Sequence, residues 1–168
     1  MVNNQQISPV EMRGFIAHIT QTQNVLRSLG AEYKGEYVFT DHVYAVPNVD
    51  LNTEFVRIRV YQKTQWAQKN VVMVHKRAGK IIVHQEFDSI PEAYLSIDLC
   101  YQFLFSFSRT GWEYSWNQMR IFVEDIKELE PTIEVIAASV EQIQSLFELL
   151  CITRNTDQSL AAIMSKRL

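Results

Sequence analysis

The octet E-F-V-R-I-R-V-Y, residues 54–61, decides how the fold of this chain is interpreted. β-Branched residues dominate it, and apolar and polar side chains alternate strictly, which predicts a β-strand. One face of this strand carries Val56, Ile58 and Val60, and the other carries Arg57 and Arg59. In a half-exposed antiparallel sheet these arginines would be solvated, whereas in a sheet that encloses a space they would face a negatively charged group.

Composition bounds the class of protein. The chain has 168 residues, 47% of them hydrophobic, which is enough for the core of one domain over residues 1–168. The net charge of −3 gives no indication of a nucleic-acid or membrane-surface protein, and no apolar stretch is long enough to span a bilayer. Cys100 and Cys151 fit no metal-ligand spacing and are predicted to be buried free thiols, which favours a cytoplasmic protein.

Alternation and capping signals predict an α+β fold with eight strands and four helices. The predicted strands cover residues 7–18, 35–46, 54–63, 69–77, 80–88, 106–114, 118–126 and 131–138, and the predicted helices cover 20–29, 90–104, 139–150 and 156–166. A three-residue loop 78–80, with Gly79 at a positive φ, is favoured over a two-residue turn between the fourth and fifth strands. This register places Lys76 on the same sheet face as His84 and Glu86.

The charged faces of other strands repeat the pattern of the octet. Such a sheet either lies open under a layer of helices or closes into a barrel whose charged faces line the interior. Four partly apolar helices need sheet surface to cover, which favours an eight-stranded antiparallel closed β-barrel with the helices packed outside. The basic residues on the charged faces are Arg13, Arg57, Arg59, Lys76, Arg109 and Arg120. Confining these cations is unfavourable unless carboxylates, metal or a polyanion lie among them, so a strongly negative ligand is expected.

Two further groups of side chains have structural interpretations. Trp112, Tyr114 and Trp116 share one strand face and are predicted to belong to the core, with stacking on a nucleobase or capping of the barrel end as alternatives. His75 is predicted to face the helix layer in a structural role.

Several motifs occur in an order that is similar to a known family. They are L-R-S-L-G-A-E-Y-K-G-E-Y-V-F-T-D-H-V-Y-A-V-P (26–47), F-V-R-I-R (55–59), V-V-M-V-H-K (71–76), V-E-D-I-K-E-L-E-P-T-I-E-V-I (123–136) and S-L-A-A-I-M (159–164). Taken together they resemble the CYTH superfamily, also called triphosphate tunnel metalloenzymes, which includes class IV adenylyl cyclases, thiamine triphosphatases and inorganic triphosphatases. The resemblance implies an eight-stranded antiparallel tunnel that binds a triphosphate.

The resemblance also implies roles for individual residues. The implied phosphate-binding residues are Arg13, Arg57, Arg59, Lys76, Arg109 and Arg120. The implied ligands of Mg²⁺ or Mn²⁺ are Glu11, Glu124 and Glu134, with Glu86 as an assisting group, and the implied catalytic residues are Glu11, Glu134 and Lys76. Pro9 and Ile136 stand where the family has carboxylate ligands. Two alternatives are therefore left: a site that holds one metal ion, and a tunnel that binds polyphosphate without hydrolysing it.

Four functions remain open at this point. The favoured one is a metal-dependent phosphohydrolase acting on a nucleoside, thiamine or inorganic triphosphate. The alternatives are an adenylyl cyclase of the class IV type, a non-catalytic nucleotide- or polyphosphate-binding module, and a structural or partner-binding barrel. The expected partner is a small-molecule triphosphate, with no nucleic acid and no membrane, and the expected state is a monomer or homodimer.

Overall fold

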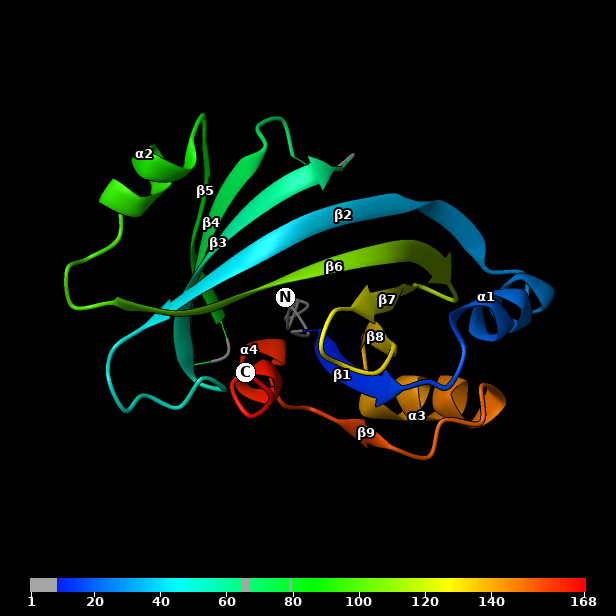
Figure 1. Cartoon of the computed structure of the whole chain (residues 1–168). Helices are drawn as coiled ribbons and strands as arrows, with labels where there is room; N and C mark the ends of the chain where they lie inside the picture. The colour runs from blue at the N-terminus through cyan, green and yellow to red at the C-terminus, as the bar shows by residue number, and fades with distance from the viewer. Residues whose placement is uncertain (1–8, 65–66, 79) are drawn as a thin grey trace, which may run out of the picture. The chain divides into compact units, whose positions relative to one another are not determined.

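The structure is a computed structural model that describes residues 9–64, 67–78 and 80–168. Within these residues it has nine strands and four helices, which confirms the α+β class (Figure 1). The strands are β1 (Val10–Phe15), β2 (Glu32–Ala45), β3 (Glu54–Lys63), β4 (Val71–Arg77), β5 (Lys80–Phe87), β6 (Gln102–Trp116), β7 (Met119–Ile126), β8 (Thr132–Ala137) and β9 (Asn155–Thr156). The helices are α1 (Ile19–Ser28), α2 (Ile90–Leu95), α3 (Val140–Leu149) and α4 (Leu160–Met164).

The described strands belong to one sheet with the order β5-β4-β3-β2-β6-β7-β8-β1-β9. The neighbouring pairs β1–β8, β1–β9, β2–β3, β3–β4, β4–β5 and β7–β8 are antiparallel. Because β5 and β9 end this order, hydrogen bonds between described residues do not close the sheet, and the predicted closed barrel is not confirmed. The ninth strand was not expected: residues 155–156 pair with β1, where the sequence predicts the start of a helix.

The chain forms two compact units, and each is described by itself. The first unit comprises Met1–Lys34, Trp112–Glu124 and Glu130–Asp157. The second unit comprises Gly35–Gly111, Asp125–Leu129 and Gln158–Leu168. The assignment of residues 1–168 to a single domain stays a prediction.

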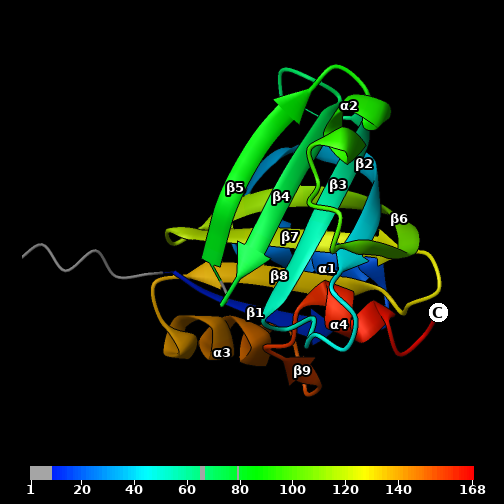
Figure 2. The same cartoon turned by 90° about the vertical axis from the view of Figure 1, so that its left-hand side faces the viewer.

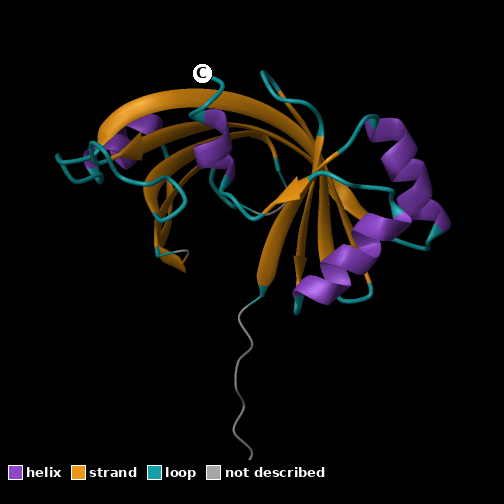
Figure 3. Cartoon of the chain, turned by 90° about the horizontal axis from the view of Figure 1, so that it is seen from below, coloured by secondary structure: helices purple, strands orange, loops and turns teal. Residues whose placement is uncertain are grey.

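The core of the first unit lies between its strands and the helices α1 and α3, which Figure 3 shows in purple beside them. Ile121 and Val135 from the strands, Leu26 from α1 and Leu146 from α3 are fully buried in this cluster. Helix α3 begins where predicted, because the hydroxyl of Ser139 accepts a hydrogen bond from the first turn. The apolar strand faces of this unit therefore pack toward helices, as the alternation predicts.

The aromatic stripe of β6 belongs to this same core. Tyr114 is buried in it, and Trp112 and Trp116 pack against it. The indole Nε1 of Trp116 donates a hydrogen bond to the carbonyl of Leu29 at 2.9 Å. The prediction of a structural stripe is confirmed.

In the second unit, helix α2 covers the apolar face of the octet. Val56 and Ile58 of β3 and Met73 of β4 form a core with Ala93 of α2, and Figure 2 shows α2 beside β3, β4 and β5. The helix is much shorter than the predicted 90–104. It ends at Leu95, turns follow over residues 96–101, and residues from 102 onward pair in β6.

Helix α4 packs on the other face of this unit. Met164 of α4 lies in a cluster with Val43, Phe55 and Phe107. Val43 is directly opposite Arg57 in the β2–β3 pair, so these residues lie on the arginine-bearing face. The prediction that the helices pack outside, away from the charged face, is therefore wrong for α4, whose apolar residues fill part of that face.

The β4–β5 hairpin has the predicted register over most of its length. Its directly opposite residues include Val72 with Glu86 and Val74 with His84. Lys76 lies two residues beyond Val74, so it shares the face of His84 and Glu86, as predicted.

The tip of this hairpin differs from the prediction. Arg77 pairs with Lys80, so two residues connect the strands instead of three. A register shift between His75 and Lys76 absorbs the difference of one residue. Gly79, for which a positive φ is predicted, lies outside the described residues.

Two remaining predictions concern the surface. Cys100 and Cys151 are free and exposed, so the prediction of buried thiols is wrong. Among the helices that the described residues form, none has both the length and the apolar character of a membrane span.

Candidate functional site

Three arginines of the second unit surround one buried aspartate, Asp41. Arg59 lies opposite Asp41 in the β2–β3 pair and donates Nε to Oδ1 at 2.7 Å and Nη2 to Oδ2 at 3.0 Å. Arg109 of β6 donates Nη2 to Oδ2 at 2.8 Å, and Nε of Arg57 lies 3.7 Å from Oδ1. These four residues are called the arginine cluster below.

Aromatic rings hold the guanidinium groups of this cluster in place. The guanidinium carbon of Arg59 lies 3.6 Å from the ring centroid of Phe39, and that of Arg109 lies 4.5 Å from the same centroid. Phe39 precedes Asp41 by two residues on β2, so strand alternation alone places ring and carboxylate on one face. Stacking on a ring face leaves the edge of each guanidinium to form hydrogen bonds.

The cluster carries more positive than negative charge. Burial opposes ionisation of Asp41, but the charges of Arg59, Arg57 and Arg109 outweigh it and hold the pKa of this carboxyl well below its usual range. Burial and the neighbouring Arg59 lower the pKa of Arg57 to about 10, which leaves it charged at neutral pH. Three cations and one anion give 3 − 1 = +2, held among side chains whose exposure is 22% or less.

Arg57 is the cation with the fewest contacts to Asp41. Its Nε is buried, and no described residue offers this atom a hydrogen-bond acceptor. Since an unsatisfied buried donor is unfavourable, this atom indicates where a further acceptor would bind.

Lys76 and Glu86 lie on the same face of the second unit as the arginine cluster, because Val72 is directly opposite both Arg59 and Glu86. Glu86 accepts hydrogen bonds from the backbone N–H groups of Gln68, at 3.1 Å, and Lys69, at 2.9 Å. Glu86 was predicted to assist in metal binding, but in the structure its carboxylate caps the loop at residues 68–69.

In the first unit, the predicted phosphate ligand Arg13 is bound to the predicted metal ligands Glu124 and Glu134. Nη1 of Arg13 donates to Oε2 of Glu124 at 2.5 Å and to the hydroxyl of Thr132 at 2.7 Å. Nη2 donates to Glu134, which lies directly opposite Arg13 in the β1–β8 pair. Arg13 and Glu124 are almost fully buried, so this is an internal ion-pair network.

The other two predicted residues of the first unit lie at more exposed positions. Arg120 is half-exposed and binds Glu113 with Nε at 3.0 Å and Nη2 at 2.9 Å. Glu11 is exposed and lies opposite Ile136 in the β1–β8 pair.

Glu124 and Glu134, as they are arranged, are paired with an arginine and do not form a site for a divalent metal ion. Glu124 and Glu134 share the guanidinium of Arg13, which supplies the positive charge that a metal would supply. Across the part of the chain that the structure describes, no group of three or more His, Cys, Asp or Glu side chains is placed to hold a metal ion.

Sequence reasoning missed two carboxylates that bind predicted arginines. One is Asp41 at the centre of the arginine cluster, and the other is Glu113, which binds Arg120 in the first unit. Neither Asp41 nor Glu113 is among the site residues that the sequence predicts. A signal for Asp41 exists in the alternation of β2, where a carboxylate stands between Phe39 and Val43 on one face. No local signal distinguishes Glu113 from an ordinary solvated glutamate.

Comparison with solved structures shows which proteins share this fold. A protein of Pyrococcus horikoshii superposes with a TM-score of 0.76 at 15% identity, over 96% of this chain and all (100%) of the other. A candidate adenylate cyclase of Vibrio parahaemolyticus gives a TM-score of 0.71 at 12% identity, over 94% and 97% of the two chains. A candidate adenylyl cyclase of Hippeastrum, described as having a dominant triphosphatase activity, gives 0.59 at 14% identity, over 95% and 96%.

These matches agree with the resemblance to the CYTH superfamily at the level of the fold. No family model and no curated protein matches the chain by sequence.

Proposed function

We propose that this protein binds a triphosphate through its arginine cluster. The observation that carries the proposal is the buried excess of positive charge around Asp41, where three arginines share one carboxylate. Buried cations are costly without counter-charge, and the planar guanidinium fork matches the oxygens of phosphate. A polyphosphate would supply both the missing negative charge and the missing acceptors.

Asp41 has a positioning role in this proposal. It fixes Arg59 through two hydrogen bonds and Arg109 through one, so their forks are oriented before the ligand arrives. Lys76, on the same face, is a further cation within the second unit that a chain of phosphates would use. Pre-organised donors lower the entropic cost of binding.

The proposed binding does not need a divalent ion. The predicted Mg²⁺ or Mn²⁺ would bring Lewis-acid chemistry, but three of the four carboxylates implied to hold it are bound to Arg13 (Glu124 and Glu134) or cap a loop (Glu86). No step is therefore assigned to a metal. Closure of the sheet into a tunnel, a cytoplasmic location and a monomeric or homodimeric state stay predictions.

Hydrolysis of the bound triphosphate is the second candidate function, with cyclisation of ATP as its variant. It is supported by the descriptions of the Hippeastrum and Vibrio parahaemolyticus proteins that share the fold. Glu11, Glu134 and Lys76 are the residues proposed for it from the resemblance. Release of phosphate or pyrophosphate from tripolyphosphate, ATP and thiamine triphosphate, with Mg²⁺ or Mn²⁺ at high protein concentration, tests this candidate.

The binding proposal is tested by calorimetry and thermal unfolding with tripolyphosphate, once in EDTA and once in Mg²⁺. We expect saturable binding in EDTA, and stabilisation of about 2.7 kcal/mol when the ligand is at 100 times its dissociation constant. Sulfate at equal ionic strength is the control for screening and is expected to stabilise far less. Absence of binding to tripolyphosphate at millimolar concentration under both conditions would contradict the proposal.

A further inference from the structure

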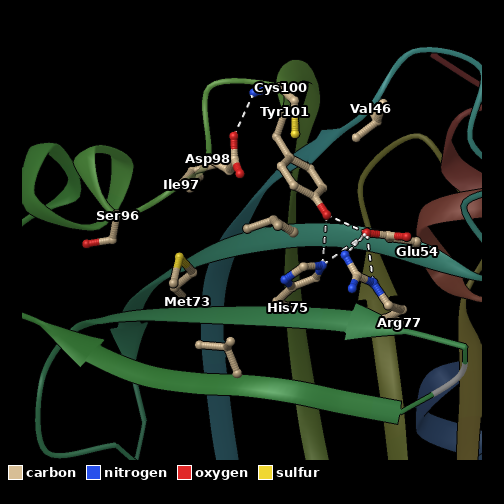
Figure 4. Close-up of a pocket in the computed structure, with 12 residues that line it drawn as sticks. Val46, Glu54, Met73, His75, Arg77, Ser96, Ile97, Asp98, Cys100 and Tyr101 are labelled. Atoms are coloured by element: carbon tan, nitrogen blue, oxygen red, sulfur yellow. Dashed lines mark hydrogen bonds and ion pairs between the residues drawn. The ribbon is translucent and has the colours of Figure 1, made fainter.

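The second unit contains a cavity that is separate from the arginine cluster. It has a volume of about 480 Å³ and lies between β3, β4 and the segment that follows α2 (Figure 4). Glu54 and Val56 line it, and these residues alternate along β3 with Phe55 and Arg57. The cavity therefore opens on the opposite face of the strand from the arginine cluster.

One end of the cavity is a hydrogen-bonded network centred on a single carboxylate oxygen. Oε1 of Glu54 accepts from Nη2 of Arg77 at 2.9 Å and from the hydroxyl of Tyr101, and it lies 3.3 Å from Nε2 of His75. The hydroxyl of Tyr101 also lies 2.9 Å from Nε2 of His75. Figure 4 shows these contacts as dashed lines that converge on Glu54.

Proton counting in this network fixes the tautomer of His75. The hydrogen bonds from Tyr101 and Arg77 lower the pKa of Glu54 to about 2, so its carboxylate is an acceptor at neutral pH. Tyr101 has one hydroxyl proton and donates it to Glu54. Nε2 of His75, which faces both oxygens, must then carry a proton of its own, and in the tautomer with this proton on Nε2 the lone pair is on Nδ1.

Nδ1 of His75 is thus an acceptor at the cavity wall. Figure 4 shows this nitrogen turned away from Glu54 and toward Met73, which also lines the cavity. No described residue donates a hydrogen bond to it. The wall is mixed. Its apolar part is formed by Val46, Val56, Met73, Val83 and Ile97, and its polar part, besides the network, by Ser96, Asp98 and Cys100.

We propose that this cavity binds a small aromatic molecule that donates one hydrogen bond, from a hydroxyl or a ring N–H, to Nδ1 of His75. The volume is in the range of small-molecule sites, and a combination of apolar side chains with a few oriented polar groups is typical of them. The thioether of Met73 and the ring of Tyr101 favour aromatic contacts. Two carboxylates, Glu54 and Asp98, line the cavity against one guanidinium, Arg77, which is itself paired with Glu54. This balance disfavours an anion and separates this ligand from the triphosphate of the arginine cluster.

The test uses phenol and toluene, which have nearly the same shape but differ in the hydrogen-bond donor. The full chain, labelled with ¹⁵N in its histidines, is titrated with each probe at neutral pH and followed by NMR of the ring nitrogens. We expect the free protein to show His75 protonated at Nε2, and phenol to shift its Nδ1 resonance saturably. Toluene is expected to bind about 3- to 10-fold more weakly and to leave Nδ1 in place.

His84 provides a matched control, because it is an exposed histidine of the same hairpin on the opposite sheet face. His84→Phe is expected to keep the preference for phenol, and His75→Phe is expected to abolish it. A His75 ring protonated at Nδ1, or a Nδ1 resonance unchanged at saturating phenol, would overturn the proposal. The tautomer of His75 and the shift of its Nδ1 resonance by phenol are both measured on the unmodified protein, so they test the proposal even if a variant does not fold. Neither measurement depends on triphosphate binding.

Discussion

Asp41 and Arg59 are directly opposite residues of β2 and β3, joined by two parallel hydrogen bonds of 2.7 and 3.0 Å. The aspartate is completely buried and is shared with Arg57 and Arg109. Asp41 therefore orients the arginines of the proposed site, while its single negative charge does not neutralise their three positive charges.

Replacing Asp41 with asparagine is expected to destabilise the protein by about 3–5 kcal/mol, since the buried arginines lose their counter-charge. Tripolyphosphate is expected to recover part of this loss, because it supplies negative charge to the same groups. Urea unfolding with and without tripolyphosphate measures both effects. Asp88→Asn, at an exposed ion pair, is the control and should change the free energy of unfolding by less than about 0.5 kcal/mol. Equal stability of Asp41→Asn and the unmodified protein would contradict this account.

Arg57→Gln is expected to weaken tripolyphosphate binding about 10- to 100-fold, which corresponds to the loss of a charge-assisted hydrogen bond. Its effect on stability should be small, because Nε of Arg57 lies 3.7 Å from Asp41 and forms no hydrogen bond to it. Arg59→Gln should lower both affinity and stability, since it removes two bonds to Asp41. Calorimetry and urea unfolding separate the two effects.

Arg77→Gln is the control for the Arg57 experiment. It removes the same charge from an exposed side chain that is bound to Glu54 at the cavity described above. Affinity for tripolyphosphate should stay unchanged. If Arg77→Gln and Arg57→Gln weakened binding equally, general attraction of anions would explain the binding better than the arginine cluster does.

Glu54 is expected to make stability depend on acid pH. Hydrogen bonds from Tyr101 and Arg77 lower its pKa from 4.5 to about 2 in the folded protein. Because the unfolded chain binds the proton more readily, the stabilising contribution of Glu54 is fully present above pH 4.5 and is lost as the pH falls toward 2. Glu54→Gln should flatten the free energy of unfolding across this window, as measured by urea titrations at several pH values. Glu128→Gln, at an exposed glutamate, should leave the slope as it is.

Arg13→Gln is expected to cost about 3–5 kcal/mol, because the buried Glu124 would lose its cationic partner. Mn²⁺ should stabilise this variant more than the unmodified protein, since the ion would find two carboxylates released from a guanidinium. Thermal unfolding with and without Mn²⁺ measures this difference. Arg154→Gln, at the more exposed pair with Glu130, is the control. Strong stabilisation of the unmodified protein by Mn²⁺ would instead favour the predicted metal site.

Much of the fold could be predicted because strand alternation is local. The alternation of the octet correctly placed Val56 and Ile58 against a helix and the arginines on the other face. The β4–β5 register was predicted correctly only away from the hairpin tip, where a register shift compensates for a loop that is one residue shorter than predicted. The helix predicted over 90–104 is too long, because residues 96–101 form turns and residues 102–104 already pair in β6. No local signal in the sequence indicates this change. The placement of α4 failed for a similar reason, since its amphipathic sequence does not say which sheet face it covers.

The amino-acid sequence by itself determined which side chains share a strand face, since that depends on a period of two residues. Tertiary structure decided which of those charges meet. Arg13 and Glu124 are 111 residues apart, and their contact exists because β1, β8 and β7 are neighbours in the sheet. Pairing between distant strands is set by the burial of the whole sheet, so the partner of a charged residue cannot be found in its local sequence.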